Sequence, residues 1–180
     1  MNLILFFDKL ISRCERAYRR VLFNKKVKIS GGGVKVYGKI HHINPNVQVG
    51  NNVEIYPGVQ FFGDGNIVIG NNVAIGNYTI IYASKEAGVY IGDNVQIAAQ
   101  SYIIDTNHGI KKGILIKDQP NESAPIHIGS DVWIAANTVI LKGVTIADGA
   151  VVGANALVNE NIPNNAIAVG VPARVVKYRE

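Results

Sequence analysis

The sequence predicts an all-β solenoid in which short parallel strands stack coil upon coil. The first observation is a six-residue period without a gap, whose leading residues are Ile128, Ile134, Ile140, Ile146, Val152 and Val158. The second is that the same period recurs upstream, between Ile43 and Ile103. The third is the number of glycines, 19 in all. Gly, and to a lesser degree Asn and Asp, tolerate positive φ and therefore suit the corners between strands. A period this short indicates stacked coils rather than helices or hairpins.

Length, cysteine content and charge limit the class of protein. A chain of 180 residues is one domain, or one solenoid with an appendage. The single cysteine, Cys14, excludes an intrachain disulfide and favours a reducing, cytoplasmic location. Residues 1–39 hold ten Lys or Arg against two acidic residues, whereas the remaining chain has a net charge of −3. Because the basic residues belong to the appendage, we expect no nucleic-acid binding.

Residues 2–23 predict an amphipathic helix with one apolar stripe, made of Leu3, Phe7, Leu10, Cys14, Ala17 and Val21. The stripe could pack on the solenoid, on a sister subunit or on an anionic membrane surface. We expect it to pack on protein within the assembly, because Cys14 and Ala17 are small. Weak, secondary contact with the inner face of the membrane is the alternative. The apolar run of residues 3–7 fits neither a secretory signal nor a membrane span.

The chain divides into three parts. We expect the basic helix and an exposed lead-in strand over residues 1–39, the solenoid over 40–165, and a tail over 166–180. The period slips by two residues between Phe61 and Ile69 and by four between Ile81 and Ile91, which indicates small corner insertions. Residues 109–125 lack the period altogether and predict a projecting loop that could wall a pocket.

Four polar residues, Asp105 to His108, end the coil that precedes this loop. A corner needs only one or two such residues. Histidine is the side chain most easily poised as a base near neutral pH, so His108 is a candidate catalytic residue. A solvated corner histidine explains the position equally well, and both readings stay open on position alone.

The stretch IGDNVQIAAQSYIIDTNH (residues 91–108), the loop, and the later VWI, GVTI and GVPAR segments resemble the hexapeptide-repeat acyltransferases. The resemblance is to the branch of galactoside, maltose, xenobiotic and capsular-polysaccharide O-acetyltransferases, and it covers residues 43–178. It implies a left-handed parallel β-helix, a homotrimer, and acetyl-CoA bound in a cleft between neighbouring coils. Gly109 stands where the maltose-type enzymes have a proline, which leaves the acceptor open.

The resemblance also implies roles for individual residues. His108 would be the general base toward an acceptor hydroxyl, which attacks the thioester directly, while Asp105 and Asn107 would orient His108 or bind the acceptor. The residues implied to contact the cofactor are Trp133, Ala136 and Ala154 along the acyl and pantetheine portion and Arg174 and Lys177 near the phosphates. Because Ala136 lacks a polar side chain, any oxyanion contact there would come from the main chain.

The predicted function is therefore CoA-dependent O-acetylation of a saccharide-type acceptor, free or lipid-linked, without a metal. Acetylation of an amino-sugar amine and a non-catalytic scaffold are the alternatives. A γ-type carbonic anhydrase would need three histidines around a zinc, two of them in an H-x-x-x-x-H spacing. The four histidines here, at positions 41, 42, 108 and 127, do not provide that spacing.

Overall fold

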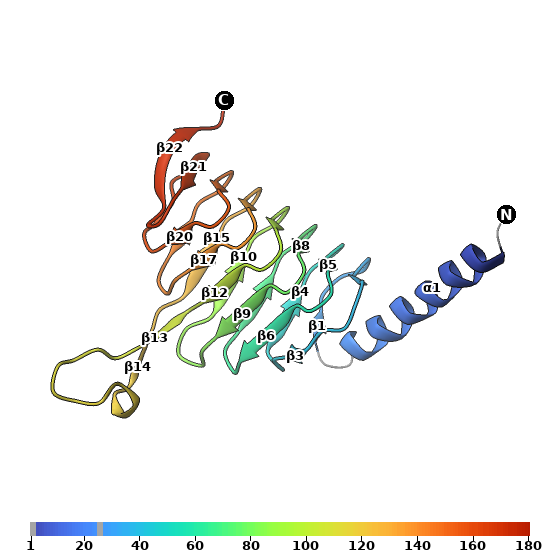
Figure 1. Ribbon diagram of the computed structural model, residues 1–180, viewed down its shortest axis with the longest axis horizontal. Helices are drawn as coiled ribbons and strands as arrows, with labels where there is room; N and C mark the ends of the chain where they lie inside the picture. The colour runs from blue at the N-terminus through green and yellow to red at the C-terminus, as the bar shows by residue number, and fades with distance from the viewer. Residues whose placement is uncertain (1–2, 25–26) are drawn as a thin grey trace.

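The chain forms a three-sided left-handed parallel β-helix preceded by one helix, in a computed structural model that describes residues 3–24 and 27–180 (Figure 1). Each coil contributes one short strand to each of three parallel sheets. Sheet A contains β1 (Lys28–Ile29), β4 (Val47–Val49), β7 (Ile67–Ile69), β10 (Val89–Ile91), β15 (Ile126–Ile128) and β18 (Thr145–Ile146). Sheet C contains β3 (His42–Ile43), β6 (Gln60–Gly63), β9 (Ile80–Ala83), β12 (Tyr102–Ile104), β17 (Val139–Ile140) and β20 (Leu157–Val158).

Sheet B is longer and includes the C-terminus. It contains β2 (Lys35–Val36), β5 (Glu54–Ile55), β8 (Ala74–Ile75), β11 (Gln96–Ile97), β16 (Trp133–Ile134), β19 (Val151–Val152), β21 (Ala166–Val169) and β22 (Arg174–Tyr178). The last two strands pair antiparallel. Residues 166–180 are therefore the end of sheet B rather than a separate tail.

The six-residue period places one aliphatic residue of each strand in the interior. Ile91 pairs with Ile69 and Ile128, and Ile97 pairs with Ile75 and Ile134, so the leading residues stack in columns. All of these side chains are at most 4% exposed. Burial of such columns is the main stabilising contribution in a solenoid, because each coil contacts only its neighbours.

The solenoid begins earlier than expected. β1 pairs with β4 and β2 pairs with β5, and Val27, Val34 and Val36 are buried in the same core. The boundary expected at residue 40 is therefore wrong, and residues 27–39 are the first part of the solenoid rather than an exposed lead-in strand. Gly31–Gly33 lie in the corner between β1 and β2.

Asparagines at one corner of successive coils form a ladder. Asn52, Asn72 and Asn94 all have φ between 55° and 59°, which asparagine tolerates better than most residues. The Asn52 Nδ2 donates to Asn72 Oδ1 at 3.1 Å, and the Asn72 Nδ2 donates to Asn94 Oδ1 at 3.0 Å. Hydrogen bonds between the asparagine side chains thus link the corners of successive coils.

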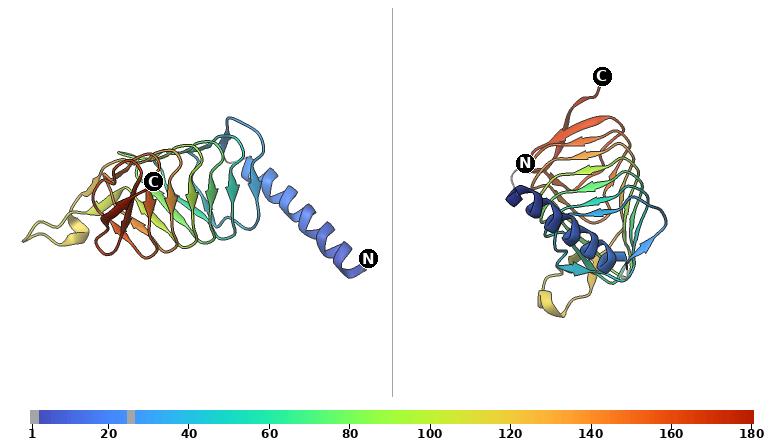
Figure 2. Two further views of the ribbon diagram at one scale, coloured as in Figure 1. Left: turned by 90° about the horizontal axis from the view of Figure 1, so that it is seen from above. Right: turned by 90° about the vertical axis from the view of Figure 1, so that its right-hand side faces the viewer.

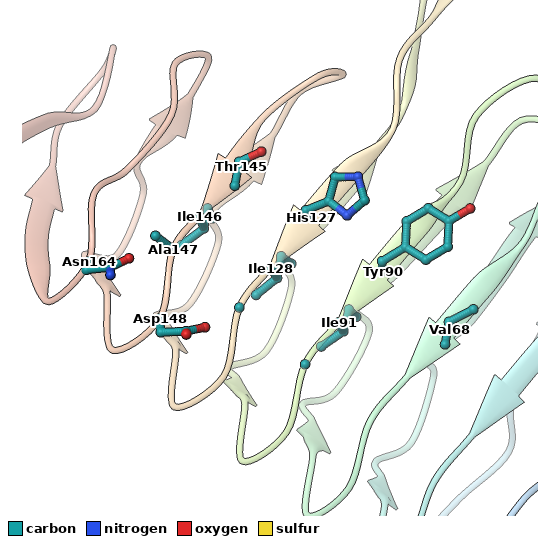
Figure 3. Close-up of a pocket in the computed structure, with 12 residues that line it drawn as sticks. Val68, Tyr90, Ile91, His127, Ile128, Thr145, Ile146, Ala147, Asp148 and Asn164 are labelled. Carbon is teal, nitrogen blue, oxygen red and sulfur yellow. The ribbon is translucent and has the colours of Figure 1, made fainter.

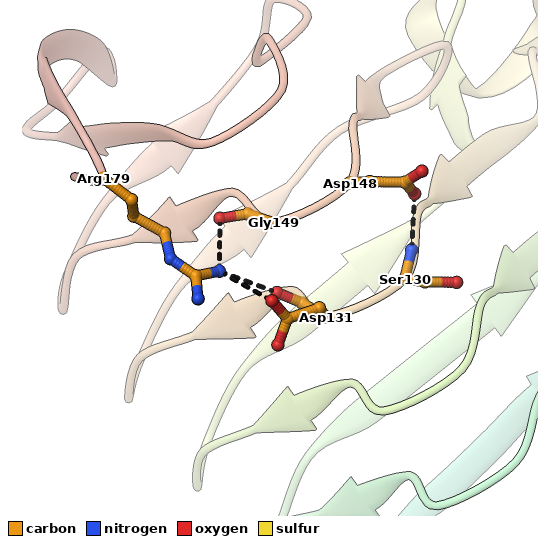
Figure 4. Close-up of polar contacts among 5 residues, drawn as sticks. All are labelled: Ser130, Asp131, Asp148, Gly149 and Arg179. Atoms are coloured by element: carbon orange, nitrogen blue, oxygen red, sulfur yellow. Dashed lines mark hydrogen bonds and ion pairs between the residues drawn. The ribbon is translucent and has the colours of Figure 1, made fainter.

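The ladder changes near the C-terminus, where Gly149 takes the corner position (Figure 4). Arg179 fills the gap: its Nη1 donates to the Gly149 carbonyl and to Asp131 Oδ2, both at 2.9 Å. This contact fastens the end of the chain across two coils.

Helix α1 (Leu3–Asn24) extends away from the first coil, as Figure 1 and the left view of Figure 2 show. Phe23, near its C-terminus, is buried with its ring centroid 6.4 Å from that of Phe61. The stripe residues Cys14, Ala17 and Val21 are exposed, so the chain's own solenoid does not cover them. Among the described residues, no helix combines the length and hydropathy needed to cross a bilayer.

Candidate active site

His108 lies in the stem of a projecting hairpin, not at a coil corner. β13 (Thr106–His108) pairs antiparallel with β14 (Asn121–Ser123), and the connection carries a short 3-10 helix, η1 (Ile116–Asp118). The buried Gln119 fixes the connection: its side chain accepts from the Lys111 N–H and donates to the Lys111 and Ile114 carbonyls. The predicted projection is confirmed, but its base begins at Thr106.

A polar pocket of about 440 Å³ lies beside this hairpin. Thr106, Asn121 and Ser123 line it from one face of the hairpin. His108 is two residues beyond Thr106 and directly opposite Asn121, so it belongs to the same face. The imidazole, which is exposed, therefore flanks the pocket. The rest of the lining comes from preceding coils and consists of Asp64, Tyr82, Ser84, Lys85 and Glu86, with Pro120 from the loop.

Asn107 lies on the opposite face of the hairpin stem. It pairs with Glu122, whose carboxylate lies 3.5 Å from Lys142 Nζ on the next coil. Because successive residues of a strand alternate between faces, Asn107 and His108 point away from each other. The expectation that Asn107 orients His108 or shares its acceptor does not fit this geometry.

Asp105 is fully buried, and its carboxylate is hydrogen-bonded to residues of the preceding coil. Its carboxylate accepts hydrogen bonds from the Ser84 N–H (2.9 Å), the Ser84 Oγ (3.1 Å) and the Gly88 N–H (2.7 Å). Burial raises the pKa of the Asp105 carboxyl, although these hydrogen bonds favour its ionised form. The expected contact with an acceptor or with His108 is therefore wrong, and Asp105 instead secures the corner of residues 84–88, which lines the pocket.

The residues expected to contact a cofactor gather on sheet B and the corner that follows it. Trp133 pairs with Val151, Val151 with Ile167, and Ile167 with Lys177, which places the four side chains in one outward row. Three strand spacings separate Trp133 from Lys177, about 14 Å at 4.8 Å each. Ala136 and Ala154 are exposed at successive turns of the adjoining corner, where the Asn155 N–H donates to the Ala136 carbonyl at 3.0 Å. Small side chains thus border a row with an aromatic residue at one end and a cation at the other.

Arg174 differs from Lys177 in its contacts. Its Nη2 lies 3.0 Å from Glu160 Oε1, and its Nη1 donates to the Ala173 carbonyl at 2.8 Å. Binding of a phosphate by Arg174 would compete with this ion pair, which is exposed and therefore weak.

One chain does not bring His108 to the Trp133–Lys177 row. Within a coil the chain passes from sheet B through the corner at Ala99 and Gln100 into β12, and only then reaches the hairpin. Residues 100 to 106 span about 20 Å when extended, so the two groups lie at opposite edges of sheet C. A site that uses both groups must combine two chains.

A second groove, of about 420 Å³, crosses the outer face of sheet A (Figure 3). Tyr90 and His127 stack there with ring centroids 5.0 Å apart, and Thr145, Asp148 and Asn164 continue the surface. It contains none of the predicted site residues. In residues 3–24 and 27–180, no group of three or more His, Cys, Asp and Glu residues is arranged to hold a metal ion.

Comparisons with known proteins indicate the family to which the chain belongs. Residues 125–160 match the model of the bacterial transferase hexapeptide (six repeats), and residues 66–104 match the hexapeptide repeat of succinyl-transferase. A protein of Escherichia coli K12, provisionally named colanic acid biosynthesis acetyltransferase WcaF, is 30% identical over 132 residues, which cover 73% of this chain and 69% of that protein. The chain belongs to the hexapeptide-repeat acetyltransferase family.

Two further proteins resemble the chain. Galactoside O-acetyltransferase of E. coli K12 is 42% identical over 130 residues, covering 72% of this chain and 62% of that protein. The chain thus spans about three fifths of that relative. AntD, an N-acyltransferase from Bacillus cereus solved with dTDP and 3-hydroxybutyryl-CoA, superposes with a TM-score of 0.78 at 26% identity, over 89% of this chain and 88% of that one.

Sequence reasoning missed most of the pocket, although a signal was present. The slips in the six-residue period fall at residues 62–66 and 82–88, and the projecting hairpin follows one coil later. All three interruptions occur between sheet C and sheet A, so they stack at one edge of the solenoid. Their alignment could have predicted Asp64, Ser84, Lys85 and Glu86 as pocket residues.

Proposed function

We propose that the protein transfers an acetyl group from acetyl-CoA to a hydroxyl of a saccharide-type acceptor. The observation that carries this proposal is that His108 flanks a polar pocket while a row suited to a CoA thioester lies on another face of the solenoid. Carboxylate, hydroxyl, amide and amine groups line the pocket, and these are the partners that sugar hydroxyls require. Family membership and the CoA-bound relative support the same chemistry.

The proposed reaction is a direct transfer. His108 takes the proton of the acceptor hydroxyl as its oxygen attacks the thioester carbonyl. The new C–O bond forms, the C–S bond breaks, and the proton passes to the departing CoA thiolate. No metal takes part in this scheme. The indole of Trp133 would lie near the acyl end, and Lys177 would bind phosphate at the other end of the row.

Two exposed apolar surfaces support assembly into a trimer. The outer face of sheet C carries a continuous row of half-buried residues, Ile80, Tyr102, Val139 and Leu157. The hairpin tip exposes Ile110, Ile114, Leu115 and Ile116 at 53–82% of their surfaces. Contiguous apolar patches of this kind indicate contact with another chain. In a cyclic trimer, His108 of one chain would face the Trp133–Lys177 row of the next.

Replacing His108 with Ala tests the proposal. The side chain is exposed, so the variant should fold normally, and release of free CoA thiol should fall by about 10²- to 10⁴-fold. Binding of acetyl-CoA should be nearly unchanged, because the row on sheet B is intact. Turnover within a few-fold of the wild type would refute the role of His108.

Acetylation of an amine is the second candidate, favoured by the likeness to AntD over 89% of the chain. An amine acceptor is itself nucleophilic once deprotonated, so it depends less on a base than a hydroxyl does. Matched sugars that differ only in hydroxyl or amine at one carbon distinguish the two candidates, with release of CoA thiol as the readout. The O-acetyltransferase assignment requires faster turnover of the hydroxyl sugar.

A further inference from the structure

Helix α1 contacts the solenoid through its C-terminal end. Phe23 is 1% exposed against Phe61, whereas apolar residues within the three turns before it remain open. Ile11, Tyr18 and Val21 are 59%, 65% and 53% exposed, and Cys14 and Ala17 between them are also exposed. A helix whose apolar face is open to water, as this one is from Ile11 to Val21, lacks the packing that normally stabilises it.

The contact of Phe23 with the first coil orients the apolar stripe away from the chain's own solenoid. Successive helical residues are rotated by 100° about the axis, so Val21 and Phe23 differ by about 200°. Because Phe23 faces the first coil, the stripe that contains Val21 faces the opposite direction. Rotating the stripe onto the coil would withdraw Phe23 from its contact with Phe61.

The charges of this segment indicate whether another copy of the helix or a lipid bilayer covers the apolar stripe. Residues 1–24 carry five Lys or Arg against Asp8 and Glu15, and Lys25 and Lys26 follow directly. At 100° per residue, the sequence positions of Lys9, Arg13, Arg16 and Arg20 fall along one flank of the stripe. Identical helices packed stripe against stripe in an oligomer would bring these flanking like charges close together, which is unfavourable. An apolar face backed by Lys and Arg is instead the pattern of helices that lie in the interface of anionic bilayers.

We propose that α1 lies flat on an anionic lipid bilayer, with Ile11, Cys14, Tyr18 and Val21 at the boundary between head groups and acyl chains. The solenoid would then stand on the membrane by its first coil, with the contact between Phe23 and Phe61 as the joint. The proposal reverses the expectation that the stripe packs on protein. It does not depend on the proposed catalytic function, since it rests on α1 alone.

Cys14 offers a direct readout in the unmodified protein, because it is the only cysteine and lies in the centre of the stripe. A poly(ethylene glycol) maleimide is uncharged and too bulky to enter a bilayer, and its addition is visible as a gel shift. Without lipid, Cys14 should react as fast as the thiol of a short peptide. Phosphatidylcholine vesicles containing phosphatidylglycerol should slow the reaction at least tenfold, and vesicles of phosphatidylcholine alone should slow it much less.

Two outcomes would overturn the proposal. Slow labelling in the absence of lipid means that protein, such as a second copy of this chain, covers the stripe. Fast labelling in the presence of phosphatidylglycerol vesicles means that the bilayer does not cover it.

Paired variants identify the surface responsible. Changing Ile11 and Tyr18 together to Gln should abolish sedimentation with phosphatidylglycerol vesicles. The matched control changes Val176 and Tyr178 to Gln; these residues are 58% and 55% exposed in β22, at the other end of the solenoid. The control should sediment as the wild type does. Equal loss in both variants, or a lower oligomeric mass of the helix variant in light scattering, would contradict the proposal.

Discussion

At the scale of single residues, His108 and its polar neighbours in the sequence have different surroundings. His108 and Asn107 lie on opposite faces of β13, and Asp105 lies buried under the corner of residues 84–88. The sequence predicted a polar cluster but not this division, because the partners of Asp105 are 17 and 21 residues away. Alternation along a strand would have separated Asn107 from His108, had the segment been assigned as a strand.

Lys177 and Arg174 should contribute unequally to cofactor binding. Lys177 lies in the row that begins at Trp133, whereas Arg174 is already paired with Glu160. A charge-assisted bond to phosphate contributes about 1.5–3 kcal/mol. Lys177→Ala should therefore raise KM for acetyl-CoA by about ten- to a hundredfold, and Arg174→Ala should raise it less.

Steady-state kinetics with each substrate varied in turn measure this difference. The KM for the acceptor is the internal control and should change little in either variant. If Lys177→Ala leaves KM for acetyl-CoA unchanged, the row on sheet B is not the phosphate site.

At the scale of elements, the six-residue period accounts for most of the fold. It predicted the interior columns because each leading aliphatic must face the core of its own coil. It failed at residues 27–39, because the interior residues Ile29, Val36 and Ile43 are seven residues apart rather than six. It also could not orient the N-terminal helix, because that depends on tertiary contacts of the helix's C-terminal end, such as the one between Phe23 and Phe61.

The asparagine ladder should contribute measurably to stability. Asn72 has φ of 56°, donates to Asn94 and accepts from Asn52. Asn72→Ala loses both hydrogen bonds and forces alanine into left-handed backbone, which costs about 1–2 kcal/mol. Asn72→Gly loses the same bonds without that strain.

Urea unfolding of the two variants tests the ladder. We expect both to be less stable than the wild type, with the alanine variant the less stable of the two by about 1 kcal/mol. Equal stability of the two variants would mean that backbone strain at this corner is negligible.

At the scale of the whole molecule, the solenoid separates the two halves of the proposed site. His108 and its pocket lie at the edge between sheets C and A, while the Trp133–Lys177 row lies on sheet B. Sheet C, between them, carries the apolar outer row that we assign to contact between chains. The same contact would therefore hold the trimer together and complete each site.

A charge on the outer face of sheet C should break the assembly. Val139→Glu buries a carboxylate in the proposed interface, so light scattering should report a monomer and acetyl transfer should be lost. The matched control is Val68→Glu, at a half-buried position of the same residue type on the outer face of sheet A. A trimeric, active Val139→Glu variant would show that sheet C faces solvent.

The most direct test of the shared site is complementation between two inactive variants. His108→Ala removes the base, and Ala136→Trp fills the exposed corner beside the cofactor row; each variant alone should be inactive. Coexpressed in equal amounts, they should regain about a quarter of wild-type activity, because in a cyclic trimer that fraction of sites pairs an intact His108 with an intact neighbouring corner. Mixed trimers with no activity above that of the separate variants would contradict a site built from two chains.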